Sequence, residues 1–223
     1  MAYKVVIDAG HGGSDPGATY GNRFEKDDAL DLSFAVGNIL EENGIDVEYT
    51  RVDDVYNTPF EKATMANNAN ADLLISIHRD SVPTPNSREG ISALVFNDTG
   101  FKAQLARNIN SNLEALGFRN NGVIERPNLV VLKRSKMPAV LLEVGFINND
   151  NDNMIFDENF TDIAKAIADG IIESINIQPA MTMQVEKPKL YRVQVGAFTN
   201  MDNAIRLENT LRRLGYSTFI VSS

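Results

Sequence analysis

The chain has 223 residues, the composition of an ordinary globular protein and a formal net charge of −9. A chain of this length can bury a substantial core, and one main domain with a small appendage is the natural expectation. The acidity argues against general nucleic-acid binding, which needs lysine and arginine gathered on one face. The absence of cysteine excludes disulfides, thiolate metal ligands and cysteine nucleophiles. A metal ion would therefore have to be held by histidine or carboxylate side chains.

The charge is unevenly distributed along the chain. Residues 178–223 hold six Lys or Arg against three Asp or Glu, so this tail is basic while the rest of the chain is strongly acidic. The two parts therefore suggest two functions. No apolar stretch has the length of a signal sequence or of a membrane span. These patterns predict a soluble protein that is made in the cytoplasm without a signal peptide and has no membrane partner.

Short apolar strands and amphipathic helices alternate through residues 1–177. The first expected strand, residues 5–7, runs into a loop in which several glycines surround His11. Further strands are expected at residues 45–51, 72–77, 91–96, 129–132 and 139–142, and helices at residues 26–43, 59–70, 102–116 and 160–175. Thr58 is the expected N-cap of the second helix. The alternation predicts an α/β fold, a three-layer sandwich with a central, mostly parallel sheet flanked by helices.

A segment without periodicity separates this body from the tail. Residues 178–189 contain two prolines and form the expected linker. Beyond it, residues 191–195, 201–214 and 218–221 predict a strand, a helix and a second strand. We therefore expect a body at residues 1–177, a linker at 178–189 and a small β-α-β unit at 190–223.

The only two histidines of the chain each follow an expected apolar strand. His11 comes shortly after the first strand, and His78 directly follows the strand at residues 72–77. Because the carboxyl ends of parallel strands line one crevice, both imidazoles are expected at the same place. A single histidine of this kind would more often be structural, whereas two at equivalent positions favour a functional site.

Two glutamates are candidates for the same site. Glu143 interrupts the apolar run AVLLEVGFI, where burial of an unpaired carboxylate would cost several kcal/mol. It either takes part in a site or faces solvent from an edge strand, and its apolar neighbours favour the site. Glu25 could simply stabilise a helix N-terminus. However, two histidines and one carboxylate would leave an open position on zinc for water, which is the composition of hydrolytic zinc sites.

Other motif interpretations fit the sequence less well. The glycine loop lacks the Lys-Ser/Thr pair of a P-loop and the spacing of a dinucleotide fingerprint. His78, Arg79 and Asp80 match the start of a kinase catalytic loop, but Pro85 stands where that loop needs asparagine. No G-x-S-x-G motif marks a serine hydrolase. Metal-dependent hydrolysis remains as the leading interpretation.

Four blocks of the sequence resemble the zinc-dependent N-acetylmuramoyl-L-alanine amidases. They are VVIDAGHGGSDPGA at residues 5–18, Glu25-Lys26, ADLLISIH at 71–78 and MPAVLLEVGFIN at 137–148, in family order and at family spacing. The resemblance spans residues 3 to about 176. It implies an enzyme that cuts peptidoglycan between the lactyl group of N-acetylmuramic acid and L-alanine of the stem peptide. The alternatives are a wall-binding protein with a vestigial metal site and a zinc hydrolase of another amide.

The resemblance also implies roles for individual residues. It makes His11, Glu25 and His78 the ligands of one Zn²⁺ in the catalytic domain. It makes Glu143 the catalytic carboxylate, which takes a proton from the zinc-activated water and passes it to the departing amine.

Three further residues are expected to be near the substrate. Gly12 and Gly13 should leave room for a bulky glycan-peptide to approach the metal. Arg79 stands where the family usually has a small or apolar residue. It is expected either to contact an acidic group of the stem peptide or to lie in solvent.

The basic tail resembles the first half of a SPOR repeat, a family associated with binding peptidoglycan glycan strands. A full domain of that family pairs two strand-helix-strand halves, and one half is below the size that usually folds alone. Residues 190–223 are therefore expected to bind peptidoglycan and to pair with a second chain in a homodimer. Such a protein would act on the cell wall after lysis or export, as a mother-cell autolysin or a phage endolysin.

Overall fold

The chain forms two compact units, Met1–Val185 and Glu186–Ser223, and their boundary falls inside the expected linker. The computed structural model describes residues 3–177, 194–213, 216, 218 and 220. The first unit contains the central sheet and the candidate site, and the second contains one described helix.

Six strands form the central sheet, in the order β4-β1-β5-β8-β6-β7. Their bounds are β1 Lys4–Ala9, β4 Asp46–Tyr49, β5 Leu73–Asp80, β6 Ile91–Val95, β7 Asn120–Glu125 and β8 Ala139–Phe146. β4, β1, β5 and β8 are parallel, whereas β6 is antiparallel to β8 and parallel to β7. The expected mostly parallel sheet is confirmed, with β6 and β7 running in the opposite direction. A separate hairpin of β2 Thr19–Tyr20 and β3 Arg23–Phe24 precedes the first helix.

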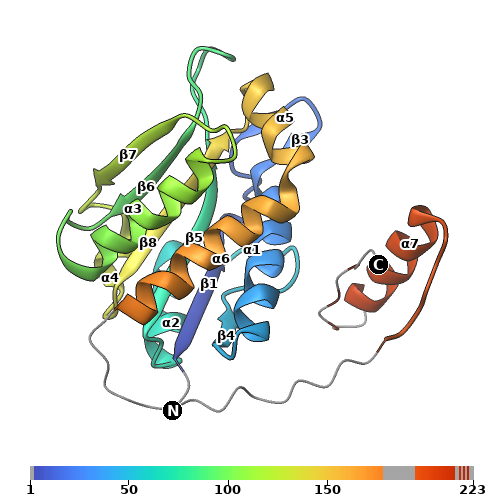
Figure 1. Ribbon diagram of the computed structural model, residues 1–223, viewed down its shortest axis with the longest axis horizontal. Helices are drawn as coiled ribbons and strands as arrows, with labels where there is room; N and C mark the ends of the chain where they lie inside the picture. Colours follow the sequence, from blue (N-terminus) through green and yellow to red (C-terminus); the bar gives the residue numbers. More distant parts are fainter. Residues whose placement is uncertain (1–2, 178–193, 214–215, 217, 219, 221–223) are drawn as a thin grey trace. The chain divides into compact units, whose positions relative to one another are not determined.

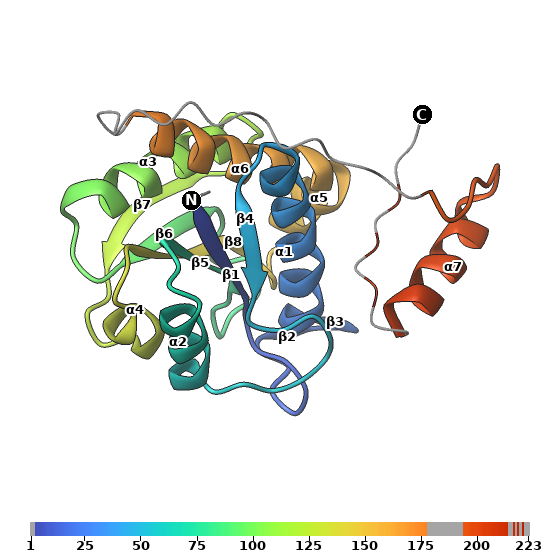
Figure 2. The same ribbon diagram turned by 90° about the horizontal axis from the view of Figure 1, so that it is seen from below.

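Helices cover both faces of the sheet, which gives the expected three layers (Figures 1 and 2). One layer contains α1 Glu25–Glu42, α3 Gly100–Glu114 and α6 Phe160–Ile177, and the other contains α2 Pro59–Asn68 and α4 Val130–Arg134. α5 Asp150–Glu158 follows β8 and leads into α6. Thr58 begins α2 as expected, through a reciprocal capping box with Glu61.

The face of the sheet beneath α2 and α4 changes character along its strands. Side chains alternate between the two faces, so every second residue of a strand lies on this one. Near α2 and α4 this face is apolar and buries Val6, Leu74 and Leu141. Two or four residues further along the same strands it becomes polar, with Asp8, Ser76, His78 and Glu143. The opposite face stays apolar under α1, α3 and α6, so the polar half of one face marks the candidate site.

The structure corrects three sequence-based expectations about elements. Residues 129–132, expected as a strand, lead into the short helix α4, because a four-residue apolar run fits either structure. β7 was not expected, since its sequence NNGVIE contains only two apolar residues. α5 was not expected either, although Asn149 caps it by accepting a hydrogen bond from the Asp152 backbone N–H.

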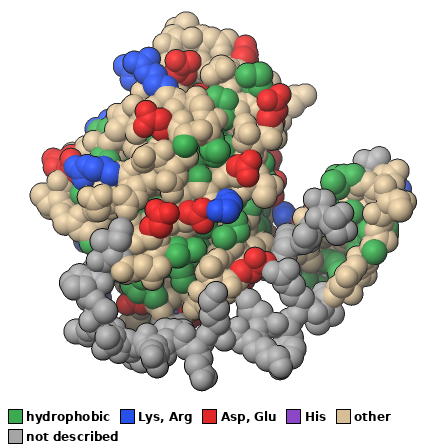
Figure 3. Space-filling model, in the orientation of Figure 1, with side chains coloured by type: hydrophobic (Ala, Val, Ile, Leu, Met, Phe, Trp, Pro, Cys, Tyr) green, Lys and Arg blue, Asp and Glu red, His purple; other side chains and the backbone are tan. Residues whose placement is uncertain are grey.

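The described part of the C-terminal unit contains α7 Met201–Arg213, where a helix was expected. Most of the expected strand at residues 191–195 and half of that at 218–221 lie outside the described residues. Among the described helices, none is both long enough and apolar enough to cross a bilayer. Acidic side chains are spread over the face of the body seen in Figure 3, in keeping with the negative net charge of the chain.

Candidate metal centre

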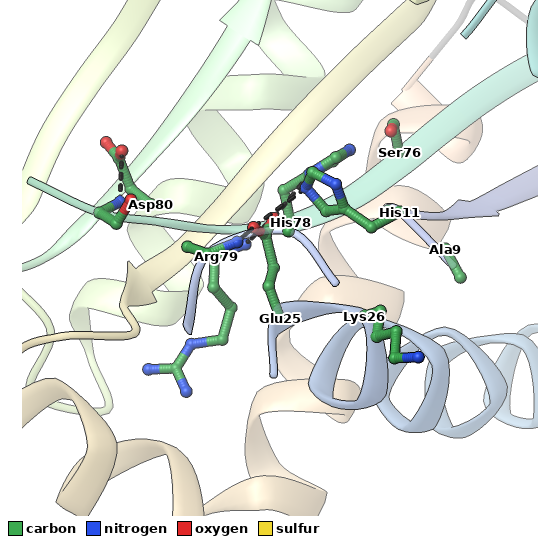
Figure 4. Close-up of polar contacts among 12 residues, drawn as sticks. Ala9, His11, Glu25, Lys26, Ser76, His78, Arg79 and Asp80 are labelled. Atoms are coloured by element: carbon green, nitrogen blue, oxygen red, sulfur yellow. Dashed lines mark hydrogen bonds and ion pairs between the residues drawn. The ribbon is translucent and has the colours of Figure 1, made fainter. Parts of the chain in front are cut away.

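Both histidines and Glu25 meet at the carboxyl ends of β1 and β5 (Figure 4). His78 is on β5, His11 is in the loop after β1, and Glu25 is the first residue of α1. Glu25 Oε2 lies 3.0 Å from His11 Nε2, and Glu25 Oε1 lies 2.8 Å from His78 Nδ1. One ligand atom from each residue lies within 4.8 Å of the others. The structure therefore brings together the three residues expected as ligands.

The loop after β1 holds His11 in an uncommon backbone conformation. Its φ angle is 57°, in the left-handed region, and Gly12 follows with a φ of 132°. Paired backbone hydrogen bonds between Gly12 and Asp15, of 2.9 and 3.0 Å, close the turn. Asp15 Oδ2 lies 2.9 Å from His11 Nδ1, which fixes the ring with Nε2 facing Glu25. Asp15 was not among the predicted site residues, although its position four residues after His11 is a signal that the sequence carries.

Two glycines allow the ligand side chains to come close to the backbone. A Cβ atom at Gly10 would lie 2.6 Å from the His78 ring. A Cβ atom at Gly17 would lie 2.6 Å from Glu25 Oε2, at a backbone φ of 67°. Any larger residue at either position would displace a ligand, so these glycines shape the cluster directly.

The protonation states of the cluster depend on one another. Burial acts to raise the pKa of Glu25, but hydrogen bonds to His11 and His78 and their positive charge lower it far below the usual range. Burial acts to lower the pKa of His11, but its hydrogen bonds and charge interactions with Glu25 and Asp15 raise it. Glu25 is therefore ionised in neutral solution, which is the form of a carboxylate that binds a metal.

Glu143 lies beside this cluster on β8. It is the register partner of His78 on β5 and of Ser92 on β6, so it occupies a central strand and not a solvent-facing edge. Its Oε2 atom is buried and has no hydrogen-bond partner among the described residues. Burial raises the pKa of Glu143, and the charges of Asp80 and Glu25 add to the effect. A buried acid with an unused oxygen next to a candidate metal site is suited to proton transfer.

Comparison with known proteins identifies the family. A family sequence model described as N-acetylmuramoyl-L-alanine amidase matches residues 5–173, which include the cluster and Glu143. The chain belongs to the N-acetylmuramoyl-L-alanine amidase family. A SPOR domain model matches residues 187–223, and the expected SPOR-like tail is thereby confirmed.

Relatives of this amidase include a sporulation-specific N-acetylmuramoyl-L-alanine amidase of Bacillus subtilis (strain 168). The two sequences are 32% identical over 224 residues, which cover 98% of this chain and 84% of the relative. A solved amidase from Clostridium difficile 630 matches with a TM-score of 0.74 and 34% identity, over 80% of this chain and 99% of the other. The catalytic domain of CwlV from Bacillus (Paenibacillus) polymyxa var. colistinus matches with a TM-score of 0.72 and 32% identity, over 79% and 99%. These structures confirm the predicted fold class.

The donor set of the amidase fits Zn²⁺. Two imidazole nitrogens and one carboxylate oxygen are ligands that zinc accepts, and three protein ligands leave its fourth position open. The unpartnered Oε2 of Glu143 lies on the same polar face, where it could contact a group at that open position. His11, Glu25 and His78 are the residues that would hold the ion.

Arg79 lies inside the amidase and points away from the cluster (Figure 4). It is 2% exposed, donates 2.8 and 3.1 Å hydrogen bonds to Asp28 Oδ2 and the Val144 carbonyl, and stacks 4.2 Å from the centre of the Phe156 ring. Both expectations for Arg79, a substrate contact and a solvent-exposed side chain, are therefore wrong. Only its backbone N–H reaches the cluster, where it donates to Glu25 Oε1 at 3.1 Å.

The structure gives Gly12 and Gly13 a further reason to be glycine, while their expected role in admitting substrate stays a prediction. A Cβ atom at Gly12 would lie 2.1 Å from the Val55 carbonyl oxygen, and one at Gly13 would lie 2.8 Å from the Tyr56 backbone nitrogen. The Gly13 N–H also donates to Asp54 Oδ1 at 2.7 Å. At both positions the space that a side chain would fill is taken by the neighbouring loop of the protein itself.

Two buried cations, which the sequence analysis did not identify, hold the backbone before His11. Lys62 Nζ donates to the Ala9 carbonyl at 2.6 Å and lies 2.9 Å from Asp8 Oδ1. Arg51 donates to the carbonyl oxygens of Ala9 and Gly10 at 3.1 and 2.8 Å. Both side chains are almost completely buried. They fix the path of the loop that carries the first ligand.

Proposed function

We propose that this amidase uses one Zn²⁺ held by His11, Glu25 and His78 to cleave the bond between the lactyl group of N-acetylmuramic acid and L-alanine of the stem peptide. The observation that carries the proposal is the position of this ligand set and of the unpartnered Glu143 carboxylate on one polar face of the sheet. The family match and the relatives support amidase activity. When bound, zinc polarises the amide carbonyl and lowers the pKa of a water molecule.

Glu143 has the properties needed to move the proton in this reaction. Its carboxylate accepts a proton from the attacking water, and the protonated acid then donates to the nitrogen of L-alanine as the lactyl C–N bond breaks. The water oxygen remains on the lactyl carboxyl group. Because burial raises the pKa of Glu143, the protonated form needed for the second step is accessible. Asp15 keeps the His11 ring oriented throughout.

Glu143→Gln tests the proposal most directly. The variant keeps the three ligands, so it should retain zinc, and it should lose activity by about 10²- to 10⁴-fold because it cannot transfer the proton. Zinc content is measured by atomic absorption, and cleavage by mass spectrometry of products from purified peptidoglycan with and without chelator.

The same measurement separates the alternatives. An active Glu143→Gln protein contradicts the assigned role. Products cut at a different amide would show that the protein is a zinc hydrolase of another amide. A zinc-loaded wild-type protein without any activity would show that it is a wall-binding protein with a vestigial metal site.

We infer that residues 190–223 bind peptidoglycan and pair with the same segment of a second chain. The SPOR match supports wall binding. Exposed apolar side chains support pairing: Val195, Phe198, Met201, Ile205, Tyr216 and Ile220. Deletion of residues 178–223 should reduce co-sedimentation with purified walls and change the protein from a dimer to a monomer in light scattering, while cleavage of soluble muramoyl peptides is retained. A full-length protein that is monomeric, or a truncated protein that is still dimeric, would contradict pairing through this segment.

We also propose that the enzyme reaches the wall after lysis or export. The sporulation-specific relative favours a mother-cell autolysin over a phage endolysin. Immunodetection in mother-cell extracts before lysis and on wall fragments afterwards would support this assignment. Detection only in phage-infected cells would contradict it.

A further inference from the structure

A polar pocket lies next to Ser92, the register partner of Glu143 on β6. Its volume is about 560 Å³. It is lined by the end of β5 and the loop that follows, by the start of β6, by β7 and the residue before it, and by residues at and after the end of β8. None of its lining residues has a role in the proposed mechanism.

The strand order places this pocket next to the reacting group. His11 follows β1, His78 lies on β5 and Glu143 lies on β8, and these three strands are neighbours in the sheet. Strands β6 and β7 come next in the sheet after β8. Ser92 on β6 is the register partner of Glu143 and lines the pocket. Since neighbouring strands lie about 4.8 Å apart, the pocket begins one strand away from the proton-transferring carboxylate. A substrate with its scissile amide at Glu143 would extend one arm into this space.

Arg88 and Arg119 give the pocket its chemistry. Both side chains are exposed at its wall, and neither guanidinium group makes a hydrogen bond or ion pair with another described residue. Asp80 and Glu89 also line the pocket, so its formal charges balance. A balanced pocket with two unpaired guanidinium groups suits a single carboxylate on a polar ligand better than a polyanion.

The wall that carries the two arginines is held firmly in place. Asn149 donates a 3.0 Å hydrogen bond to the Arg88 carbonyl, and the Ile91 N–H donates a 2.8 Å hydrogen bond to the Arg119 carbonyl. Gly90, two residues after Arg88, has a φ of 97° and packs against the backbone of Arg119. A Cβ atom at Gly90 would lie 2.0 Å from the Arg119 carbonyl oxygen. The backbone on both sides of the pocket is therefore fixed before a ligand arrives, which reduces the entropy lost on binding.

The two arms of the proposed substrate differ in charge. The lactyl carboxyl group of muramic acid forms the scissile amide and is therefore uncharged, whereas the peptide arm can carry free carboxylates. We propose that this pocket binds the stem peptide, with Arg88 and Arg119 contacting a free carboxylate beyond L-alanine. This inference rests on the proposed function. It predicts an enzyme that prefers stem peptides with free carboxylates to those in which the same groups are carboxamides.

Two matched substrates test the preference. They are N-acetylmuramoyl tripeptides that differ only in whether the carboxyl groups beyond L-alanine are free or converted to carboxamides. The zinc-loaded full chain should cleave the free acid with a kcat/KM about 10- to 100-fold higher, the range expected for hydrogen bonds to a charged group. Arg88→Gln and Arg119→Gln should each lose about tenfold on the free acid and remain unchanged on the carboxamide.

A control variant and a binding measurement complete the experiment. Arg107→Gln removes an exposed arginine from α3, on the other face of the sheet, and should keep the wild-type preference. Calorimetry with the free tripeptides should give tighter binding of the acid than of the carboxamide. The difference should disappear when Arg88 and Arg119 are both changed to Gln.

The outcomes distinguish the two proposals. Equal cleavage of both substrates by the wild type, or equal losses on both in Arg88→Gln, would overturn the pocket assignment and leave the proposed function intact. If only polymeric peptidoglycan is cleaved, equal binding of the two tripeptides would overturn the assignment. A zinc-loaded wild type that cleaves neither the tripeptides nor peptidoglycan would overturn the proposed function itself.

Discussion

The cations on the two sides of Glu143 lie in opposite environments. On the β1 side, Arg51, Lys62 and Arg79 are buried, and each donates hydrogen bonds to carbonyl or carboxylate oxygens. On the β7 side, Arg88 and Arg119 are exposed and make no ion pair with a described residue. Arg51 and Lys62 contact the loop after β1, whereas Arg79 lies on the opposite face of the sheet, against α1 and α5. What separates the two sets is whether fixed protein oxygens surround the cation.

The energetics of buried charge explain the difference. A cation is taken out of water only where fixed oxygens replace its hydration, and removal of either partner then leaves a buried group unpaired. An exposed cation keeps its water and remains free to exchange it for a ligand. Substitutions on the β1 side should therefore change stability, and those on the β7 side should change substrate selectivity.

Lys62→Met should have the largest effect on stability. It leaves Asp8 buried without its cation, and the free energy of unfolding should fall by about 3–5 kcal/mol. Urea denaturation of the metal-free protein measures the loss. The double variant Asp8→Asn, Lys62→Met is the matched control and should be more stable than Lys62→Met alone. A fully stable Lys62→Met protein with altered selectivity between the two tripeptides would break the division between the two sides.

Arg79→Met should have an intermediate effect. It loses the hydrogen bonds to Asp28 and Val144 and the stacking on Phe156, but Asp28 keeps an ion pair with Arg23 at 2.6 Å. We therefore expect a loss of about 1–3 kcal/mol in the free energy of unfolding. Zinc content and the preference for the free-acid tripeptide should be retained. A changed preference in a stable Arg79→Met protein would contradict the structural role.

Three of the four candidate site residues could be predicted from the sequence because they are rare or out of place. The chain has two histidines, and Glu143 interrupts an apolar strand. Glu25 has no such signal, and its expected role depended on the need for a third zinc ligand and on the family resemblance. Lys62 and Arg51 carry no such signal. They stand in ordinary polar segments, and only the folded chain brings them to the carbonyl groups of the loop after β1. Arg79 was misinterpreted for the same reason, since its partners come from α1, β8 and α5.

The fold was predictable where the hydrophobic pattern is long. Strands β1, β5 and β8 and helices α1, α3 and α6 all lie at expected positions, because each buries a continuous set of apolar residues. The polar edge strand β7 and the short helix α4 were missed or misassigned, because few of their residues reach the core. Residues of β7 line the pocket beside Arg88 and Arg119, and β7 was not expected, so the pocket could not be predicted either.

The smallest expected effect is the pH dependence that Asp8 contributes to stability. Burial acts to raise the pKa of Asp8, but the charges of Lys62 and His78 and hydrogen bonds from Ser76 and Thr50 lower it overall. Because the folded-state pKa is lowered, this contribution is complete above the unfolded pKa of about 3.9 and is lost as the pH falls through the folded value.

The difference in unfolding free energy between wild type and Asp8→Asn should therefore be constant from about pH 7 to pH 5 and shrink below about pH 4. Urea denaturation of the metal-free proteins at pH 7, 5 and 3 measures it. Arg88→Gln is the matched control from the other side of Glu143, and its stability should run parallel to wild type at every pH. A difference for Asp8→Asn that grows as the pH falls would mean that the buried pair does not stabilise the fold. The contrast between paired cations that hold the site and unpaired cations that bind substrate would then fail on the β1 side.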